Sequence, residues 1–393
     1  MRFASILPKA VPMSVATEFR EMPKHWAIPQ RFRYPFVKPR VPSLQRLEKY
    51  FEVSRKYGFF SNFGPIATKF ERLQNLDFQD KRSVTAANCT VGLSAALLAL
   101  GVRGSVLVPA FTFAATSSAV RAAGLDIVLG DVDSRTGVLR SENIDRLVRE
   151  GRCEAVIAVR PYGIWSDLSD VSQACVRAGI PLIVDGAAAL GVTRDIVHRF
   201  TVPDSIEVFS LHSTKPFGVG EGGLIVAPAR FEDDLRSALN FGLWTDGHIP
   251  RGTGFNGKMD ELTSAMACTV LEDIPQRIEE RQACAAKFNA WAEQDRLETF
   301  CKPGAEDIAP WQCFPVRLPF GKDAQRVVAS CANAGLQVRR YYHPAGPVAV
   351  EENLFPTSSQ LSNRTVCLPI YDGPDAELAH EIWPIFRSAV HSA

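Results

Sequence analysis

Phe209-Ser210-Leu211-His212-Ser213-Thr214-Lys215, with the glycine-rich run Gly218-Val219-Gly220-Glu221-Gly222-Gly223 close behind it, is the most informative part of this sequence. Residues 206–211 predict a strand, so Lys215 follows a strand end beside hydroxyl side chains and flexible glycines. An ε-amine forms a Schiff base with an aldehyde cofactor only when it is deprotonated and held in place, which requires a desolvated pocket or a nearby cation. Lys215 fits that requirement, and a solvated surface lysine is the alternative that the rest of the chain must decide.

The glycine-rich run also spells GxGxxG across Gly218, Gly220 and Gly223, the pattern of a dinucleotide-binding turn. Such a turn follows a strand and opens a helix, whose N-terminal amides face the pyrophosphate. Here the run leads into residues 223–228, an apolar stretch that ends at a proline and predicts a second strand. The pattern therefore joins two strands, and no acidic residue about 20 positions later closes a second strand. We reject the dinucleotide-binding interpretation.

Composition places the chain among ordinary globular proteins. It has 393 residues, of which 46% are hydrophobic and 22% charged, and a formal net charge of +1. Such a balance provides no basic field that would attract nucleic acid or an acidic membrane. No apolar run approaches the roughly 18 residues of a membrane-spanning helix. We therefore expect neither nucleic acid nor a membrane as partner, and a cytoplasmic location.

The nine cysteines are scattered, odd in number and without a CxxC pair. The seven histidines show no ligand spacing either. Disulfide frameworks and zinc sites both need such spacings. We expect no metal site, and reduced cysteines that pack as small apolar side chains.

The order of helical and strand patterns predicts three parts: an N-terminal arm at 1–42, a large domain at 43–270 and a smaller C-terminal α/β domain at 271–393. The arm is rich in proline, arginine and aromatic residues and has little periodicity. In the large domain, strand and helix patterns alternate, which indicates a mostly parallel sheet flanked by helices. Strands are expected at 105–108, 126–129, 155–159, 181–184, 206–211 and 223–228, and helices at 42–56, 90–100, 114–123, 142–150 and 171–178.

A long helix over about 260–291 is expected to leave the large domain, with Pro275 marking a break or kink. The small domain then reads as a strand at 312–318, a helix at 323–334, a strand at 337–341 and a final helix near 376–390. This pattern predicts a second α/β unit.

Polar and aromatic residues cluster at the carboxyl ends of the predicted strands, where open α/β sheets bind their ligands. Asn88, Cys89 and Thr90 open a helix whose free amides and hydroxyl can hold a phosphate, although they also suit an ordinary cap. Phe113 can lay its ring on a planar ligand, although aromatic residues more often pack in a core. Ser210 ends another strand of this set.

Asp185 ends an otherwise apolar run, residues 180–184, which places a carboxylate near the buried centre of the sheet. A buried carboxylate needs a cationic partner or several hydrogen-bond donors. A protonated pyridine nitrogen is one such cation, and a turn or cap role before Gly186 is the alternative.

Six motifs occur in order along the chain. They are Asn62-Phe63-Gly64-Pro65 with Phe70-Glu71, Asn88-Cys89-Thr90, residues 109–116, Asp185-Gly186-Ala187-Ala188, residues 210–215 with 220–223, and residues 254–259. Together they resemble the motifs of the DegT/DnrJ-type sugar aminotransferases, over about residues 57–390. The resemblance implies the fold type I of pyridoxal-phosphate-dependent transferases, with a seven-stranded, mostly parallel sheet in the large domain and a smaller C-terminal α/β domain.

The resemblance implies that the cofactor is pyridoxal 5'-phosphate and that three residues are catalytic. Lys215 would carry the cofactor as a Schiff base and later move a proton between substrate and cofactor. Asp185 would keep the ring nitrogen protonated. His212 would lie beside the substrate.

The resemblance also implies which residues hold the cofactor. Phe113 would stack on its ring, and Cys89, Thr90 and Ser210 would grip its phosphate. Asn256 would reach the phosphate from a neighbouring subunit, because members of the family are homodimers with shared active sites.

The chain departs from the family pattern at several positions. Ala188 stands where the family has a glutamine, and Pro216 stands where it has an asparagine. Arg160-Pro161 stands where the family has a segment that contains a histidine. Residues 342–346 differ from the family's C-terminal Tyr-x-Pro-x-His. These changes leave the amine, the acid and the phosphate cup in place but bear on the substrate. The side chains that could contact a diphosphate or a base are Arg31, Arg33, Arg339, Arg340 and those of residues 244–254.

From these observations we expect an aminotransferase that moves an amino group from glutamate to a keto sugar, most simply a nucleotide-linked one. Two alternatives stay open. One is another pyridoxal-phosphate enzyme that acts on a cyclitol ketone or a keto acid, or that ends in racemisation or elimination. The other is a sensor that keeps the fold and binds a ligand without turnover.

Overall fold

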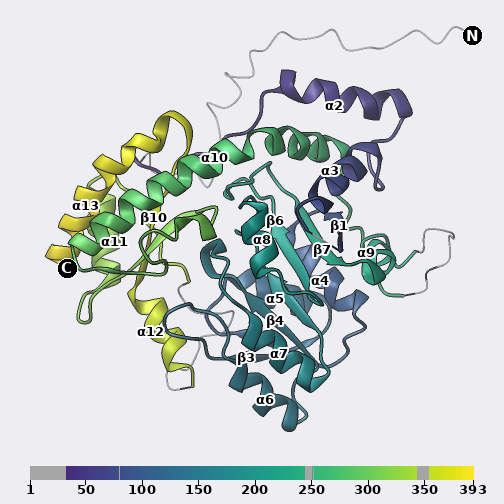
Figure 1. Ribbon diagram of the computed structural model, residues 1–393, viewed down its shortest axis with the longest axis horizontal. Coiled ribbons are helices and arrows are strands. Elements are labelled where there is room, and N and C mark those ends of the chain that lie inside the picture. Colours follow the sequence, from purple (N-terminus) through teal and green to yellow (C-terminus); the bar gives the residue numbers. More distant parts are fainter. Residues whose placement is uncertain (1–31, 79, 244–249, 251, 343–353) are drawn as a thin grey trace, which may run out of the picture.

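The structure of the protein is a computed structural model (Figure 1), which describes all residues except 1–31, 79, 244–249, 251 and 343–353. Most of the predicted N-terminal arm, Arg31, much of the 244–254 loop and most of the 342–346 motif lie outside the described residues. The chain forms a central sheet with helices around it and a smaller group of strands and helices at its carboxyl end. Within the described part, no helix is both long and apolar enough to cross a membrane.

The central sheet has seven strands in the order β1-β7-β6-β5-β4-β2-β3. Their bounds are β1 Lys81–Ala86, β2 Ser105–Pro109, β3 Asp126–Gly130, β4 Ala155–Val159, β5 Leu182–Asp185, β6 Ile206–Ser210 and β7 Gly223–Pro228. Strands β3, β2, β4, β5 and β6 run parallel, whereas β7 is antiparallel to both β6 and β1. The predicted mostly parallel sheet is confirmed. The glycine-rich run joins two antiparallel strands and opens no helix.

Eight helices of the described residues accompany this sheet before the long helix that follows it. They are α2 Leu44–Tyr57, α3 Pro65–Asn75, α4 Cys89–Ala99, α5 Ala114–Ala122, α6 Ser141–Arg149, α7 Ser169–Ala178, α8 Arg194–Phe200 and α9 Glu232–Ala238. The predicted helices at 42–56, 90–100, 114–123, 142–150 and 171–178 are confirmed within a few residues. Strand β1 was missed because its buried positions include Lys81, Ser83 and Thr85, so that it lacks an apolar run.

Both faces of the sheet are covered, because successive side chains of a buried strand point to opposite faces. On one face, Val108 and Val208 belong to a core cluster shared with α4, α5 and α9. On the other face, Leu107 packs with residues of α6 and α7, and Phe209 packs with residues of α10, Glu261–Gln294. Nearly continuous apolar strands are therefore the pattern that this architecture requires.

Helix α10 is 34 residues long and contains Pro275 inside it. It begins beside α2 and α3 and ends beside α13, Ala379–Ser392, so it runs along both parts of the molecule (Figure 1). The predicted long helix is confirmed. Of the break or kink predicted at Pro275, the break does not occur, because tertiary packing keeps the helix continuous through the missing amide. The proposed boundary at residue 270 therefore falls within a continuous helix.

The carboxyl-terminal part has a three-stranded antiparallel sheet in the order β10-β9-β8. Its further elements are β8 Glu298–Thr299, β9 Cys313–Arg317, α11 Ala324–Asn333, α12 Pro356–Arg364 and β10 Thr365–Pro369, with 3-10 turns η5 Glu306–Ile308 and η6 Gly373–Leu378. Two more such turns, η3 Pro161–Gly163 and η4 Ala229–Phe231, lie in the large part. The predicted strand at 337–341 is wrong, because that segment makes only single bridges, including Arg339 with Cys367.

Candidate active site

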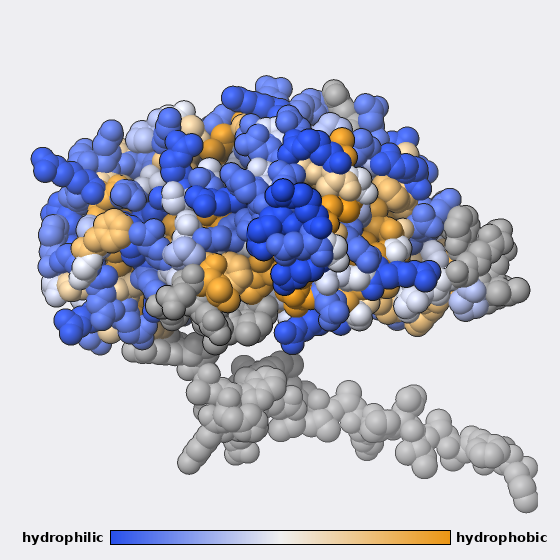
Figure 2. All heavy atoms as spheres, turned by 90° about the horizontal axis from the view of Figure 1, so that it is seen from below, coloured by the Kyte–Doolittle hydropathy of each residue, from blue (hydrophilic) through white to orange (hydrophobic). Residues whose placement is uncertain are grey.

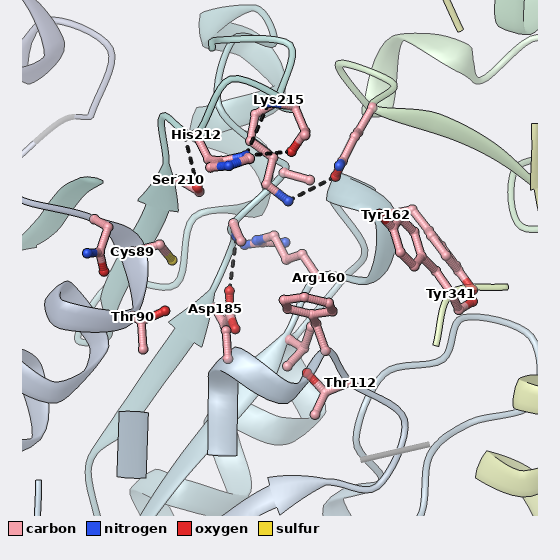
Figure 3. Close-up of a pocket in the computed structure, with 18 of the residues that line it drawn as sticks. Cys89, Thr90, Thr112, Arg160, Tyr162, Asp185, Ser210, His212, Lys215 and Tyr341 are labelled. Carbon is pink, nitrogen blue, oxygen red and sulfur yellow. Dashed lines mark hydrogen bonds between the residues drawn. The ribbon is translucent and has the colours of Figure 1, made fainter. Parts of the chain in front are cut away.

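A cavity of about 620 Å³ opens where the parallel strands end (Figure 3). Its lining comes from the starts of α4 and α5, from the segments after β4, β5 and β6, and from residues 312 and 339–342 of the carboxyl-terminal part. The predicted site residues that line it are Cys89, Thr90, Phe113, Asp185, Ser210, His212 and Lys215. Residues far apart in sequence thus share one enclosed volume, as the strand-end argument predicts.

Lys215 lies in the loop after β6, and its amine faces the cavity (Figure 3). The Nζ atom donates a hydrogen bond of 3.0 Å to Oε1 of Gln312, and the backbone amide donates to the carbonyl of His212 at 2.8 Å. Burial lowers the pKa of the Lys215 amine from its usual value, because the charged form loses its hydration. The structure therefore favours a neutral, nucleophilic amine at this position.

Asp185 is the last residue of β5, and only 5% of it is exposed. One carboxylate oxygen, Oδ2, accepts from the hydroxyl of Thr116 at 2.7 Å, and Oδ1 accepts from the amide of Ala187 at 3.1 Å. The Thr116 hydroxyl is in turn 2.7 Å from that of Thr112. Burial raises the pKa of Asp185, opposed by these donors and by the charge of Lys215.

The carboxylate of Asp185 forms no ion pair with another of the described residues. A cationic group that entered the cavity would therefore supply the charge that this buried acid lacks. A protonated ring nitrogen is such a group, which is the first observation that fits pyridoxal phosphate to this site.

The start of α4 forms the other end of the cavity. The side chain of Asn88 caps the helix by accepting from the amide of Val91 at 2.9 Å, so the first-turn amides of Cys89 and Thr90 have no acceptor within the helix. A Cβ atom on Gly223 would lie 2.6 Å from the carbonyl carbon of Asn88, so only glycine lets β7 approach the helix start this closely. This end fits a phosphate.

Ser210 is the last residue of β6 and lines the cavity. It is buried, and its Oγ atom accepts from the amide of His212 at 3.2 Å. Its hydroxyl hydrogen is thereby free to point toward a ligand. The structure thus gives the cavity a phosphate-sized polar end, an acid and an amine.

His212 is oriented by its neighbours. Its Nδ1 atom accepts from the amide of Thr214 at 3.2 Å and lies 2.8 Å from the hydroxyl of the same residue. Because Nδ1 is an acceptor, the neutral ring carries its proton on Nε2, which is 3.6 Å from Oε1 of Glu221. Glu221 also lines the cavity, so His212 and Glu221 form a polar pair there.

Aromatic rings form the wall opposite the helix start. Figure 3 shows Tyr162 and Tyr341 across the cavity from Cys89 and Thr90. The ring of Tyr162 stacks on that of Tyr342 with centroids 5.6 Å apart. Flat, partly apolar walls of this kind suit a ring-shaped ligand.

Phe113 precedes α5 as its cap residue, and 58% of it is exposed. Its ring meets that of Tyr341 edge to face, with centroids 6.4 Å apart. An exposed phenyl ring at a cavity wall has no core role, so the structure leaves it available to cover a planar ligand.

Asn256 is the one predicted site residue outside the set that lines the cavity. It is exposed, and the next residue, Gly257, accepts from the amide of Ala87 at 2.7 Å. The segment therefore lies just before the start of α4 without reaching into the cavity of its own chain.

The sequence did not indicate the contacts of three residues of the site. Gln312 falls at the start of a predicted strand, and its contact with Lys215 spans 97 positions. Thr116 stands in the motif at residues 109–116, but nothing in the sequence indicates its hydrogen bond to Asp185. Tyr341 falls in the predicted strand that does not form.

The departures from the family pattern have structural partners. The guanidinium of Arg160 is buried, donates to the carbonyls of Ser166 and Phe200 at 2.9 and 2.7 Å, and lies 4.3 Å from the ring centroid of Trp165. It also forms a buried ion pair with Glu207, with Nη2 3.5 Å from Oε2, so Arg160 is held by a charge partner and by two carbonyls. Ala188 lines the cavity but carries no polar group.

Comparison with known proteins points in one direction. The model of the DegT/DnrJ/EryC1/StrS aminotransferase family matches residues 45–386. A curated relative, the dTDP-4-amino-4,6-dideoxy-D-glucose transaminase of Shigella dysenteriae, is 25% identical over 370 residues, covering 90% of this chain and 97% of the relative. The protein Rv3402c of Mycobacterium tuberculosis is 25% identical over 360 residues, covering 86% of each chain.

Solved structures share the fold. The structure of DesI in the presence of its TDP-sugar product superposes with a TM-score of 0.80 at 25% identity, covering 92% of this chain and 94% of that one. NtdA of Bacillus subtilis with bound cofactor PMP gives a TM-score of 0.74 at 20% identity, covering 91% of this chain and 88% of that one.

Proposed function

Because this chain belongs to the DegT/DnrJ/EryC1/StrS aminotransferase family, it is a pyridoxal-phosphate-dependent aminotransferase, and we propose that it transfers an amino group from L-glutamate to a nucleotide-linked keto sugar. The observation that carries this proposal is the arrangement of Lys215 and Asp185. A desolvated amine and a buried acid without a cationic partner among the described residues line one cavity.

The residues that would hold the cofactor follow from the fit described above. When bound, pyridoxal phosphate supplies an aldehyde carbon and an electron-withdrawing ring. Lys215 would supply the amine that holds the aldehyde. Asp185 would pair with a protonated ring nitrogen, and Phe113 would cover one face of the ring. The start of α4 and the hydroxyls of Thr90 and Ser210 would receive the phosphate.

Lys215 is also the group that moves a proton during transfer. With cofactor and amino donor bound, its amine would take a proton from the donor's α-carbon and return it to another carbon. The oxygen of Gln312 holds this amine at one point of the cavity. His212, fixed by Thr214, presents Nε2 to the polar part of a substrate.

The acceptor class rests on the relatives. The Shigella dysenteriae relative is named as a transaminase of a dTDP-linked amino sugar, and the DesI structure was determined in the presence of its TDP-sugar product. The aromatic wall of Tyr162, Tyr341 and Tyr342 supports the same class, because sugar rings pack their C–H faces on aromatic rings. Glutamate as donor remains part of the proposal.

We also propose a homodimer in which Asn256 serves the partner's cavity. Large apolar side chains are exposed at Tyr57, Phe59, Phe60 and Phe241. On the face drawn in Figure 2, hydrophobic patches likewise interrupt a mostly hydrophilic surface. Exposed apolar groups of this size favour burial against a second copy. Light scattering on the purified protein measures its mass and so tests whether it is a dimer.

A cytoplasmic location belongs to the same proposal. All nine cysteines are buried and unpaired. Free thiols in this number are typical of a reducing compartment.

The test of the proposed function uses the two half-reactions. The protein loaded with pyridoxal phosphate is mixed with L-glutamate, and 2-oxoglutarate is measured together with the visible absorbance of the cofactor. We expect one equivalent of 2-oxoglutarate per bound cofactor. The protein that has taken up the amino group is then mixed with nucleotide-linked keto sugars. An amino sugar identified by mass spectrometry completes the cycle.

Other results would reject the proposal in distinct ways. Racemised glutamate, or an elimination product without 2-oxoglutarate, assigns a different pyridoxal-phosphate reaction. Cofactor binding without any change on adding amino acids assigns a sensor. Lys215→Ala is the control, because it removes the amine and leaves the rest of the cavity.

A further inference from the structure

Arg339 lines the active-site cavity from the carboxyl-terminal part of the chain. Its Nη1 atom donates to the hydroxyl of Tyr341 at 2.7 Å. Figure 3 places Tyr341 across the cavity from Cys89 and Thr90. Arg339 therefore lies on the side that remains when the cofactor occupies the space between the start of α4 and Asp185.

The guanidinium of Arg339 is held from behind. Its Cζ atom is 4.6 Å from the ring centroid of Phe36, and its backbone exchanges hydrogen bonds of 3.1 and 2.7 Å with Cys367. A planar cation supported on an aromatic face keeps its edge free for a ligand. The guanidinium is therefore held in position before a ligand binds.

Arg339 forms no ion pair with a carboxylate of the described residues, and it uses one of its five N–H donors in the bond to Tyr341. The neighbouring residue behaves differently. Arg340 does not line the cavity, and it donates to Gln325, to the carbonyl of Ser362 and to Asn363. Of two adjacent arginines, one turns to α11 and α12 and the other faces the cavity.

We propose that Arg339 binds an anionic group of the substrate, namely a carboxylate of the amino donor. The inference rests on the proposed function, because it assigns a residue to the donor of that reaction. A guanidinium pairs with a carboxylate through two parallel hydrogen bonds, which fixes the orientation of the bound molecule.

Arg339 and Gln312 stand on neighbouring segments of the carboxyl-terminal part. Arg339 pairs with Cys367, and Cys367 pairs with Pro315 of β9. Two strand spacings and three residues along the chain place the backbone of Arg339 about 14 Å from that of Gln312, the partner of Lys215. Both side chains line the cavity, so the cation of Arg339 and the amine of Lys215, which Gln312 holds, face one enclosed space.

A diphosphate of a nucleotide-linked acceptor is the other source of an anion for the same cation. A carboxylate is favoured because it carries one charge and Arg339 is a single cation. The other arginine among the described lining residues, Arg160, already pairs with Glu207 at 3.5 Å.

The test measures binding of glutarate, which has the two carboxylates of glutamate but no amine to react. The loaded enzyme, Arg339→Gln and Arg339→Lys are titrated with glutarate by calorimetry at constant ionic strength. We expect glutarate to bind Arg339→Gln about 10- to 100-fold more weakly than wild type, the range of one charged pair of hydrogen bonds. Arg339→Lys should fall between them, because it keeps the charge but loses the planar fork.

Two controls sharpen this result. Arg340→Lys, the adjacent arginine, should bind glutarate as wild type does. Thymidine 5'-diphosphate, titrated into the same proteins, reports the other source of an anion. Equal binding of glutarate by wild type and Arg339→Gln overturns the proposal, and so does weaker binding of thymidine 5'-diphosphate alone.

The outcome is separable from that of the proposed function. Arg339-dependent glutarate binding in a protein that forms no 2-oxoglutarate from glutamate upholds the carboxylate site and rejects the transamination. Transamination with unchanged glutarate affinity in Arg339→Gln upholds the reaction and rejects the site. Arg339→Lys keeps the test valid even when Arg339→Gln fails to fold.

Discussion

The Nζ atom of Lys215 donates a 3.0 Å hydrogen bond to Oε1 of Gln312, a residue 97 positions away. This bond joins the loop after β6 to the start of β9, so the amine is held by both parts of the molecule. A neutral amine that accepts and releases protons needs one fixed position, and an amide oxygen provides it without adding charge.

Replacing Gln312 by leucine should slow proton transfer and leave cofactor attachment intact. Loss of one hydrogen bond to the amine corresponds to a decrease in kcat of roughly threefold to tenfold. Single-turnover kinetics with glutamate and α-deuterated glutamate check this, and the isotope effect should increase. Gln312→Asn should restore part of the rate. An unchanged isotope effect with a raised KM would assign Gln312 to substrate binding instead.

The amine of Lys215 should react with acetic anhydride at a lower pH than is usual for lysine in the cofactor-free protein. Burial lowers the pKa of this amine, so its neutral form is present at lower pH. Labelling followed across pH by peptide mass spectrometry measures this directly, with exposed Lys302 as the reference. A Lys215 that acetylates only at the pH of exposed amines contradicts the desolvated pocket.

Asp185→Asn should abolish most transfer activity and change the pH dependence of stability in the cofactor-free protein. Burial raises the pKa of Asp185 in the folded state above the value of 3.8 that applies when unfolded. Between pH 3.8 and the raised folded-state pKa, the folded protein therefore binds more protons than the unfolded one. The wild type loses stability as the pH rises through this range. The amide that replaces the carboxyl group has no such proton to lose.

The melting temperature of Asp185→Asn relative to wild type should therefore increase from acidic to neutral pH, measured by calorimetry without cofactor. With cofactor bound, the wild type should have the higher melting temperature, because an asparagine side chain cannot pair with a ring cation. A difference that does not vary with pH would mean that this carboxyl group is not desolvated.

Glu261→Ala should lower the free energy of unfolding by about 3 kcal/mol. Glu261 is fully buried at the start of α10, and its carboxylate accepts from the amides of Ile66 and Ala67, each at 2.9 Å, and from the hydroxyl of Ser54 at 2.8 Å. The substitution leaves these donors unpaired. Urea denaturation measures the loss, and Glu279→Ala, an exposed position on the same helix, should change little.

Gly223→Ala should weaken cofactor binding. A Cβ atom at this position would lie 2.6 Å from the carbonyl carbon of Asn88, so the start of α4 must shift. The dissociation constant of pyridoxal phosphate should rise about tenfold or more, because the helix amides then miss the phosphate. Gly252→Ala, which has open space around its Cβ, is the matched control. Equal affinities would remove α4 from the phosphate site.

Local sequence signals predicted the parts of the site that lie at strand ends. Asp185 and Ser210 are the last residues of β5 and β6, as the apolar runs before them indicated. The same rule could not find Gln312, and Arg339 was named only as a candidate contact of a diphosphate or a base, because their positions depend on how the carboxyl-terminal part packs across the sheet. A single sequence carries no local pattern for such a contact.

The fold was predicted where burial and periodicity agree and missed where they conflict. Strand β1 buries Lys81 and Thr85, whose polarity conceals the strand. Residues 337–341 alternate like a strand but form only single bridges, since Tyr34 and Cys367 meet the segment at separate points. Helix α10 continued through Pro275 because packing along its length outweighs one lost hydrogen bond.

The continuity of α10 has a consequence for donor selection. One unbroken helix contacts α3 at its beginning and η6 and α13 toward its end, so a hinge within it would break several backbone hydrogen bonds at once. We therefore expect the spacing between Lys215 and Arg339 to change little when a donor binds, and a donor one methylene shorter or longer than glutamate to bind more weakly.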